Sequence, residues 1–309
     1  MSYYVSGYYQ EKAILKKDGH LFLYNVRKQT HLQAQWWKEM QQYRSQNFQK
    51  RNNRKFFRSM PAEGKEMMQD KFFMEQQDNL FYAKRNIVDS IYSQSKLEGI
   101  AVTFPEVQEI YEGRSVAGLS VEELIKINNL KHGWKMMFAT VNAPFDFQYI
   151  QKLNQKVGEG IVIHAGKLRN SDVSIGGTSW KPEIPIYEKI ESEIQAIMNA
   201  DLSVTERAIT IMLYIMRSQM FFDGNKRTAQ LAANQIMIQG GAGVLRIPVE
   251  CQKKFFTKLI GYYETGNMRE VKRFVYDTSI DGFVKKQIEQ PEISAEMFRK
   301  AVQEKRFWK

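Results

Sequence analysis

The sequence predicts a mainly α-helical protein with one β-hairpin in its helical body and a small basic region at its N-terminus. From about residue 66 onward, apolar residues recur at near-helical spacing almost to the end of the chain. Helix-start sequences occur within this stretch, whereas Gly-rich, strand-like sequences gather in one place. Apolar residues make up 43% of the 309 residues, which is enough for a sizeable core.

Positive charge is concentrated near the N-terminus. The chain has a net charge of +11, and residues 1–85 hold 16 Lys or Arg against 8 Asp or Glu. The sequence Pro61-Ala62-Glu63-Gly64 is the best linker candidate. We therefore predict a basic N-terminal region over residues 1–65, a helical domain over residues 66–290 and a C-terminal tail over residues 291–309.

The composition argues against several classes of protein. Cys251 is the single cysteine, which excludes a disulfide framework and a cysteine-based zinc site. The four histidines show no metal-ligand spacing. The start of the chain lacks a signal-peptide pattern, and no run of about 18 apolar residues indicates a membrane span. We expect a cytoplasmic protein with no membrane segment.

The basic N-terminal region shows two patterns. Ile14-Leu15 and Leu21-Phe22-Leu23-Tyr24 flank Asp18-Gly19, which indicates a hairpin. Further along, basic residues alternate with aromatic residues over residues 50–58. Such a run can bind single-stranded nucleic acid by stacking and phosphate contacts. A helical appendage with solvated charges is the alternative that we favour, because the spacing matches no nucleic-acid-binding signature.

The helical domain opens with an apolar stripe that runs from Met67 to Tyr92. This stripe predicts a helix that ends near Glu98, with Gly99 just past its end. Thr103 and Pro105 predict the start of a short helix, since proline suits a first helical turn.

Two capping boxes mark later helix starts, Ser120-Val121-Glu122-Glu123 and Ser203-Val204-Thr205-Glu206. The helix after the second box is apolar on nearly every side, so we expect it at the centre of the domain. Between the two boxes, residues 160–166 and 173–177 resemble two short strands bounded by Gly, Asn and Ser. They predict a β-hairpin.

A short loop joins the central helix, which should stop at about Ser218, to a helix that begins near Lys226. The loop contains Asp223-Gly224-Asn225 and is followed by Arg227. A helix N-terminus offers unpaired N–H groups and a partial positive charge to a phosphate, and lysine and arginine add full charges. Asp223 can supply a hard oxygen ligand for Mg²⁺. A plain turn between two helices is the alternative.

Three segments resemble those of one known family. The stretch Gln219-Met220-Phe221-Phe222-Asp223-Gly224-Asn225-Lys226-Arg227-Thr228-Ala229-Gln230 resembles the Fic signature, and its Asn-Lys-Arg-Thr-Ala part is similar to that of the Doc toxins. The sequence Val173-Ser174-Ile175-Gly176-Gly177 resembles the Fic flap, and Ser95-Lys96-Leu97-Glu98-Gly99 resembles the Fic inhibitory motif. The resemblance covers roughly residues 85–285.

The resemblance implies a fold and an activity. The fold would be the Fic (Fido) helical core with a β-hairpin flap and an inhibitory helix over residues 85–99. Most characterised members transfer AMP from ATP to a hydroxyl group of another protein. ATP or another nucleotide and Mg²⁺ would be the cofactors. A protein substrate or partner would add a strand to the flap, and the chain could also form a homo-oligomer.

The resemblance also implies a role for each site residue. Asp223 would bind Mg²⁺, and Gly224 and Asn225 would form a phosphate-binding nest. Arg227 would hold the phosphates beside Lys226. Two further residues act differently: Phe221 would anchor the loop in the core, and Glu98 would enter the nucleotide site and block productive binding.

Four positions depart from the family pattern. Gln219 replaces the histidine that serves as general base, and an amide does not titrate near neutral pH. We expect Gln219 to face the nucleotide all the same. Lys226 replaces the glycine of the common AMP-transferring variant, and Gln230 replaces the second arginine, the usual partner of Glu98. Glu98 would pair with Arg227 or Lys226, or simply end a helix. Gln94 replaces the Ser or Thr of the inhibitory motif.

These departures leave three hypotheses. The chain is a Fic-type transferase of weak activity, or a Fic-derived module that senses nucleotide or binds a protein without catalysis. The third hypothesis is a protein that binds nucleic acid through residues 1–65. His164, in the predicted flap, is the histidine nearest by sequence order to the loop, and we expect a structural role for it.

Overall fold

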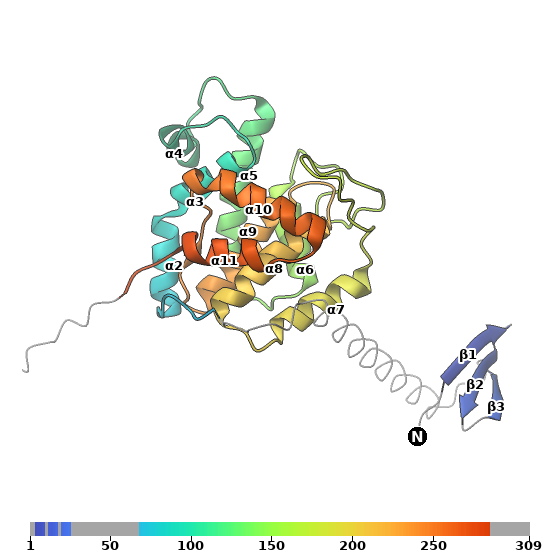
Figure 1. Cartoon of the computed structure of the whole chain (residues 1–309). Helices are drawn as coiled ribbons and strands as arrows, with labels where there is room; N and C mark the ends of the chain where they lie inside the picture. The colour runs from blue at the N-terminus through green and yellow to red at the C-terminus, as the bar shows by residue number, and fades with distance from the viewer. Residues whose placement is uncertain (1–3, 10–11, 18–19, 26–67, 285–309) are drawn as a thin grey trace, which may run out of the picture. The chain divides into compact units, whose positions relative to one another are not determined.

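The computed structural model describes residues 4–9, 12–17, 20–25 and 68–284 (Figure 1). The chain divides into two compact units, Met1–Ala62 and Glu63–Lys309, and each is described by itself. The basic run at residues 50–58 and the tail at residues 291–309 lie outside the described residues. Their predicted roles therefore stay predictions.

The N-terminal unit contains a three-stranded antiparallel sheet in the order β1-β2-β3. Its strands are β1 (Tyr4–Tyr9), β2 (Lys12–Lys17) and β3 (His20–Asn25). Lys17 pairs with His20, so Asp18-Gly19 is the two-residue connection between β2 and β3. The predicted hairpin is confirmed, whereas β1 was not predicted.

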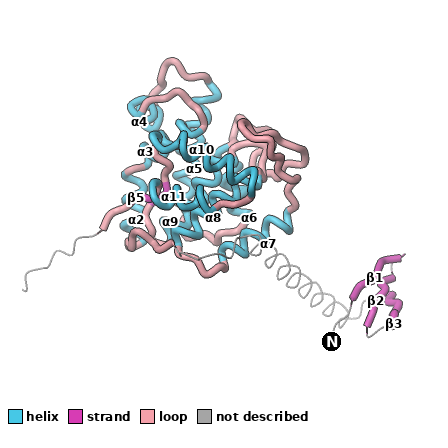
Figure 2. Tube along the Cα trace, in the orientation of Figure 1, coloured by secondary structure: helices cyan, strands magenta, loops and turns pink. Residues whose placement is uncertain are grey.

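Within residues 68–284, the regular secondary structure of the second unit is mainly helical, and loops join the helices, as Figure 2 shows. The mainly α-helical class is thereby confirmed. Its short strands β4 (Val244–Leu245) and β5 (Ile280–Asp281) form one antiparallel pair. The helices are α2 (Gln76–Arg85), α3 (Ile87–Leu97), α4 (Phe104–Glu112), α5 (Val121–Ala139), α6 (Phe147–Val157), α7 (Tyr187–Met198), α8 (Val204–Ser218), α9 (Asn225–Gln239), the 3-10 helix η1 (Val249–Cys251), α10 (Gln252–Thr265) and α11 (Arg269–Thr278).

Helix α8 lies at the centre of this unit, as its apolar sequence predicts. Every residue from Ala208 to Met216 is buried. Helix α9 packs along it and is buried from Arg227 to Ile238. A helix that is apolar on every side is stable only when other elements bury all of its faces. The remaining helices of this unit bury α8.

The predicted helix starts are confirmed at Thr103, Ser120 and Ser203. Ser120 and Glu123 form a complete capping box. At Ser203 only half of the box forms: the serine accepts the N–H of Glu206, but the Glu206 carboxylate binds Lys272 at 2.7 Å instead. The glutamate therefore ties α8 to α11 in place of closing its own cap.

The single helix predicted from Met67 to Glu98 is wrong in its first part. Residues 68–75 are not helical, and α2 and α3 are separated at Asn86. The Asn86 side chain donates to the Tyr82 carbonyl at 2.9 Å, a local bond that competes with helix continuation. The predicted end is confirmed, because α3 stops at Leu97 and Gly99 has a φ of +79°.

The predicted β-hairpin flap is also wrong in its local structure. Residues 158–186 are turns and loop without a strand. Gly160, Gly166 and Gly177 have left-handed φ values between 74° and 84°, which interrupt an extended chain. Arg169 binds backbone carbonyls on both sides of the loop, so these oxygens are not available to a strand ladder. We call residues 158–186 the flap loop.

None of the helices among the described residues is both long enough and apolar enough to cross a membrane.

Candidate functional site

The loop between α8 and α9 is shaped by two left-handed residues. Gln219 ends α8 with φ 45° and ψ 55°, and it is the single non-glycine residue with positive φ in the described part of the chain. Gly224 begins α9 with φ 77°. A Cβ at Gly224 would lie 3.1 Å from Asn154 Nδ2 and 3.2 Å from Val157 Cγ2. Backbone conformation and close packing therefore both require glycine at this position.

Phe221 and Asn225 fix the inner side of the loop. The Phe221 ring is buried and stacks on Phe147, with ring centres 6.3 Å apart. Asn225 Oδ1 accepts the Phe221 N–H at 3.0 Å, and its Nδ2 donates to the Phe221 carbonyl at 2.7 Å. The predicted role of Phe221 as an anchor agrees with this packing. The Asn225 side chain holds the loop, so only its backbone N–H can serve a phosphate nest.

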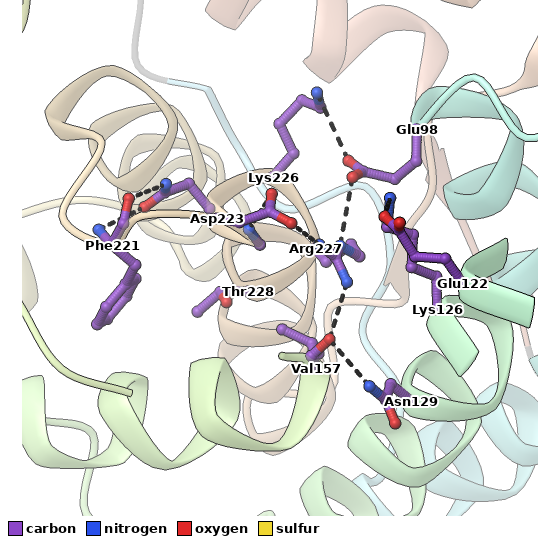
Figure 3. Close-up of polar contacts among 12 residues, drawn as sticks. Glu98, Glu122, Lys126, Asn129, Val157, Phe221, Asp223, Lys226, Arg227 and Thr228 are labelled. Atoms are coloured by element: carbon purple, nitrogen blue, oxygen red, sulfur yellow. Dashed lines mark hydrogen bonds and ion pairs between the residues drawn. The ribbon is translucent and has the colours of Figure 1, made fainter. Parts of the chain in front are cut away.

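Arg227 lies in the first turn of α9 with a fully buried side chain (Figure 3). Its Nη1 donates to the Val157 carbonyl at 2.8 Å, and its Nη2 donates to Asp223 Oδ2 at 2.9 Å. A buried guanidinium requires counter-charges and acceptors, because desolvation disfavours the isolated ion. Asp223 supplies one counter-charge while its side chain stays half exposed.

Glu98 supplies the second counter-charge from the end of α3. Its Oε2 lies 3.3 Å from Arg227 Nε, and its Oε1 lies 3.6 Å from Lys226 Nζ. Figure 3 shows both contacts reaching the same carboxylate. Glu98 Oε1 and Arg227 Nε are buried, and neither finds a hydrogen-bond partner among the described residues. The two groups attract each other as ions without the geometry of a hydrogen bond.

Lys226 contacts Glu98, whereas Gln230, at the position of the family pattern's second arginine, does not. The Lys226 ammonium reaches Glu98 and lies 5.9 Å from the centre of the Phe256 ring of α10. Gln230 is buried, and its Nε2 donates to the Lys226 carbonyl at 3.3 Å. Glu98 thus pairs with Arg227 and Lys226, which was one of the two predicted alternatives.

The Gln219 side-chain amide forms hydrogen bonds with Met216 and Asn225. Its Nε2 donates to the Met216 carbonyl at 2.6 Å, and its Oε1 accepts from Asn225 Nδ2 at 3.1 Å. These bonds hold the side chain in place as a cap of α8.

Two polar residues that the sequence analysis missed hold the loop from outside. Asn154 of α6 donates to the Asp223 carbonyl at 2.9 Å and to Thr228 Oγ1 at 3.1 Å. Arg169 of the flap loop donates from Nε to the Gln219 carbonyl at 2.6 Å. Both are buried. The one sequence signal for Asn154 is its position on the apolar face of α6, between Leu153 and Val157.

The segment that follows the predicted flap residues connects them to the rest of the unit. The predicted flap residues are Val173, Ser174, Ile175, Gly176 and Gly177. Gly177 lies close to Ile260 of α10, and Thr178 donates to Glu264 at 3.1 Å. Trp180 stacks on Tyr263 at 6.0 Å. His164 is exposed, with its ring 6.2 Å from that of Phe222. The flap loop therefore borders the α8–α9 loop at Phe222 and, through Arg169, at Gln219.

These contacts define the class of protein. It is a helical protein in which two cations and two carboxylates lie together at the N-terminus of α9, beside the α8–α9 loop. Among the described residues there is no group of three or more His, Cys, Asp or Glu side chains that could hold a metal ion alone. Asp223 is the half-exposed carboxylate of the loop. Such a site suits a ligand that brings its own phosphate oxygens.

Part of the chain is similar to proteins of one known family. The model of the Fic/DOC family matches residues 144–237. The chain is 24% identical over 196 residues to the protein adenylyltransferase Fic of Drosophila yakuba, covering 60% of this chain and 39% of the relative. It is 22% identical over 196 residues to fic-1 of Caenorhabditis briggsae, covering 60% of this chain and 38% of the relative. The chain spans about two fifths of the length of these curated relatives.

The solved structures agree on the fold. Fic-1 from C. elegans superposes with a TM-score of 0.58 at 17% identity, covering 89% of this chain and 79% of that chain. A Fic family protein from Desulfovibrio desulfuricans superposes with a TM-score of 0.50 at 14% identity, covering 66% of this chain and 64% of that chain. The chain has the fold of solved Fic proteins, and its residues 144–237 match the Fic/DOC family model.

Proposed function

We propose that the protein binds ATP or another nucleotide with Mg²⁺ at the α8–α9 loop. It transfers AMP, or another phosphate-containing group, weakly to a hydroxyl group of a second protein. The observation that carries the proposal is the fully buried Arg227, which is held by Asp223 and Val157 at the start of α9 and faces Glu98. The curated relatives are protein adenylyltransferases, which supports this class of reaction.

Phosphate binding follows from the charges of the loop. The first N–H groups of α9 have no intrahelical partner, and the helix dipole adds partial positive charge. Gly224 lets the backbone approach a ligand closely, and Arg227 and Lys226 add two full charges. Arg227 Nε lacks a hydrogen-bond partner, so a phosphate oxygen would gain a bond that Glu98 does not make.

Asp223 is the residue of the loop that would hold Mg²⁺. Mg²⁺ in proteins commonly takes one or two carboxylates together with substrate phosphates. Asp223 is half exposed, so one of its oxygens can turn from Arg227 toward a metal ion. The metal would neutralise phosphate charge as the transferred group leaves.

Glu98 competes with the phosphates for the same two cations. Its carboxylate lies within 3.3 Å of Arg227 and 3.6 Å of Lys226, where an anionic ligand would otherwise pair. A nucleotide must displace Glu98 or bind in a less favourable place. The structure thus supports the inhibitory role that the resemblance implies for Glu98.

Gln219 limits the chemical step. In AMP transfer the hydroxyl oxygen bonds to the α-phosphorus, the bond to pyrophosphate breaks, and the hydroxyl proton must leave. A glutamine amide does not accept that proton near neutral pH, so the proton passes to water. Loss of a positioned base typically lowers a rate by about 10²–10⁴-fold.

The alternative is a nucleotide-sensing or protein-binding module without catalysis. One observation favours it: the Gln219 amide donates to the Met216 carbonyl and accepts from Asn225, so both ends of the amide are used within the protein. In either case the partner would be a protein whose extended segment lies along Val173–Gly177 of the flap loop.

The first test is titration calorimetry with ATP, with and without Mg²⁺. We expect binding that depends on Mg²⁺ and that is lost in Arg227→Ala. Arg273→Ala, which removes an exposed arginine of α11, is the matched control and should bind like the parent. Lys226→Ala, a change at a more exposed position of the same site, should weaken binding without the risk of a buried cavity.

Two outcomes would count against the proposal. Equal binding in the parent, Arg227→Ala and Lys226→Ala would place the nucleotide elsewhere. Absence of binding in both the parent and Glu98→Gly would mean that the loop is only a turn.

If ATP binds, labelling of proteins with ATP carrying a radioactive α-phosphate separates a transferase from a binding module.

A further inference from the structure

A second cationic site lies away from the nucleotide loop, where α4 packs against α5. Lys131 and Lys135 of α5 approach the same ring, that of Tyr111 of α4. Their ammonium groups lie 5.4 Å and 5.8 Å from the ring centre. His132 and Lys135 are exposed, and Lys131 is half-buried. We call these four residues the basic surface; Figure 1 shows α4 at the edge of the helical unit.

The acidic residues near the basic surface form ion pairs with other basic residues. The ion pairs of this region are Glu109 and Glu112 with Arg114, Glu122 with Lys126 at 2.6 Å, and Glu159 with Lys156 at 2.7 Å. Within residues 68–284, neither Lys131 nor Lys135 forms an ion pair. Two lysines thus share an aromatic ring without a counter-charge.

The charges of the basic surface repel one another. Lys131 and Lys135 are one turn apart on α5, a spacing at which like charges destabilise a helix. Burial and then the Lys135 charge lower the pKa of Lys131. Burial and then Lys131, Lys156 and Lys135 lower the pKa of His132, with Glu159 acting in the opposite direction. This repulsion lowers the stability of the free protein, and binding of an anion would reduce the repulsion.

We propose that the basic surface binds the phosphate backbone of a nucleic acid. Lysine binds phosphate as a point charge, and contacts of this kind position a nucleic acid without reading its sequence. The proposal concerns α4 and α5; it is independent of residues 1–65 and of the nucleotide site.

An acidic protein segment fits the basic surface less well. Protein interfaces are enriched in arginine and in aromatic anchors and depleted in lysine. Here the cations are lysines, and the faces of the Tyr111 ring are approached by their ammonium groups. Arg114, the nearby arginine, is bound to Glu109 and Glu112.

The test is fluorescence anisotropy of a labelled single-stranded oligonucleotide of mixed sequence, about 30 nucleotides long, titrated with the full chain between about 50 and 200 mM salt. The variant is Lys131→Gln/Lys135→Gln. The control is Lys189→Gln/Lys258→Gln, which removes the same charge from lysines of α7 and α10 that have acidic partners. We expect affinity to fall at least several-fold in the variant and much less in the control.

The salt dependence gives a second expected value. Each phosphate contact contributes about 0.7 to the slope of log affinity against log salt for a single strand. Loss of two contacts should therefore reduce the slope by about 1.4 in the variant. We also expect the variant to unfold at the same or a higher temperature, because a repulsion has been removed.

Three results would overturn the proposal. The first is unchanged affinity in the variant, and the second is an equal loss in variant and control, which would reflect net charge alone. The third is tighter binding of a polyglutamate peptide than of the oligonucleotide, lost in the same variant. That result would make an acidic protein the partner.

Discussion

Glu98 Oε2 lies 3.3 Å from Nε of the fully buried Arg227, yet the two groups form an ion pair without a hydrogen bond. Glu98 ends α3, whereas Arg227 begins α9, so the pair joins two helices at the candidate functional site. An ion pair of poor geometry is a contact that an anionic ligand can replace with a better one. This relationship leads to the first prediction.

Glu98→Gly should raise nucleotide affinity. Removal of the carboxylate frees Arg227 and Lys226 for phosphate, and coupling of this kind typically changes affinity about 5–150-fold. The same change leaves a buried guanidinium with one counter-charge fewer, so the free protein should lose about 1–3 kcal/mol. Calorimetry and urea unfolding measure the two effects. Unaltered affinity would mean that Glu98 merely ends a helix.

Gln219→His should increase transfer if the rest of the site is competent. A positioned imidazole can accept the hydroxyl proton, and such a base contributes about 10²–10⁴-fold. The measurement is incorporation of radioactive α-phosphate into protein, with Gln219→Asn as the control that restores no base. The gain should appear most clearly together with Glu98→Gly. If no gain appears in the double variant, Lys226 and Gln230 have already remade the site.

Gly224→Ala should destabilise the protein and weaken nucleotide binding. The φ of 77° is strained for alanine, and its Cβ would meet Asn154 and Val157 at 3.1–3.2 Å. We expect a loss of about 1–3 kcal/mol of unfolding free energy. Gly261→Ala is the matched control, since nothing lies within 4 Å of its added Cβ in the middle of α10. There alanine should stabilise by about 0.5–1 kcal/mol.

Asn225→Ala should loosen the α8–α9 loop. The Asn225 side chain bonds both backbone groups of Phe221 and the Gln219 amide. Its removal leaves buried groups unsatisfied, at a cost of about 1–3 kcal/mol each. Asn128→Ala, which removes one bond to the Leu124 carbonyl on α5, should cost clearly less. Hydrogen exchange of residues 219–224 is the measurement, and equal protection in both variants would contradict this role.

Glu193→Gln should make the protein less sensitive to pH. Burial raises the pKa of the Glu193 carboxyl, while the hydrogen bond from Tyr214 and the charge of Lys189 act to lower it. The folded protein therefore holds the proton more tightly than the unfolded chain. Stability contributed by this group is present below the ordinary glutamate pKa and is lost as pH rises through the raised value.

The glutamine variant keeps an oxygen for the Tyr214 hydroxyl but cannot ionise. We expect it to be more stable than the parent at neutral pH and to lose less stability as pH rises above the ordinary glutamate pKa. Glu188→Gln, at an exposed position of the same helix, is the control. The measurement is thermal unfolding of the parent and of both variants at several pH values. The same dependence of stability on pH in both variants would contradict the prediction.

The sequence alone determined the helical class and the boundaries that frame the site. The capping residues Ser120 and Ser203, the end of α3 at Glu98 and the loop after Ser218 follow from local chemistry, because helix starts and stops depend on neighbouring residues. The resemblance of the α8–α9 loop likewise identified Asp223, Gly224 and Arg227 as the residues of interest.

Only the tertiary structure decided which partners these residues have. The pairing of Glu98 with Arg227 joins helices far apart in the sequence, and no local pattern encodes it. Asn154 and Arg169 hold the loop through backbone oxygens, which give no signal in a sequence. The flap loop lacks strands because Arg169 and left-handed glycines use its backbone otherwise. Buried charges and carbonyls are satisfied by whatever the fold brings near, so their partners are a property of the folded chain.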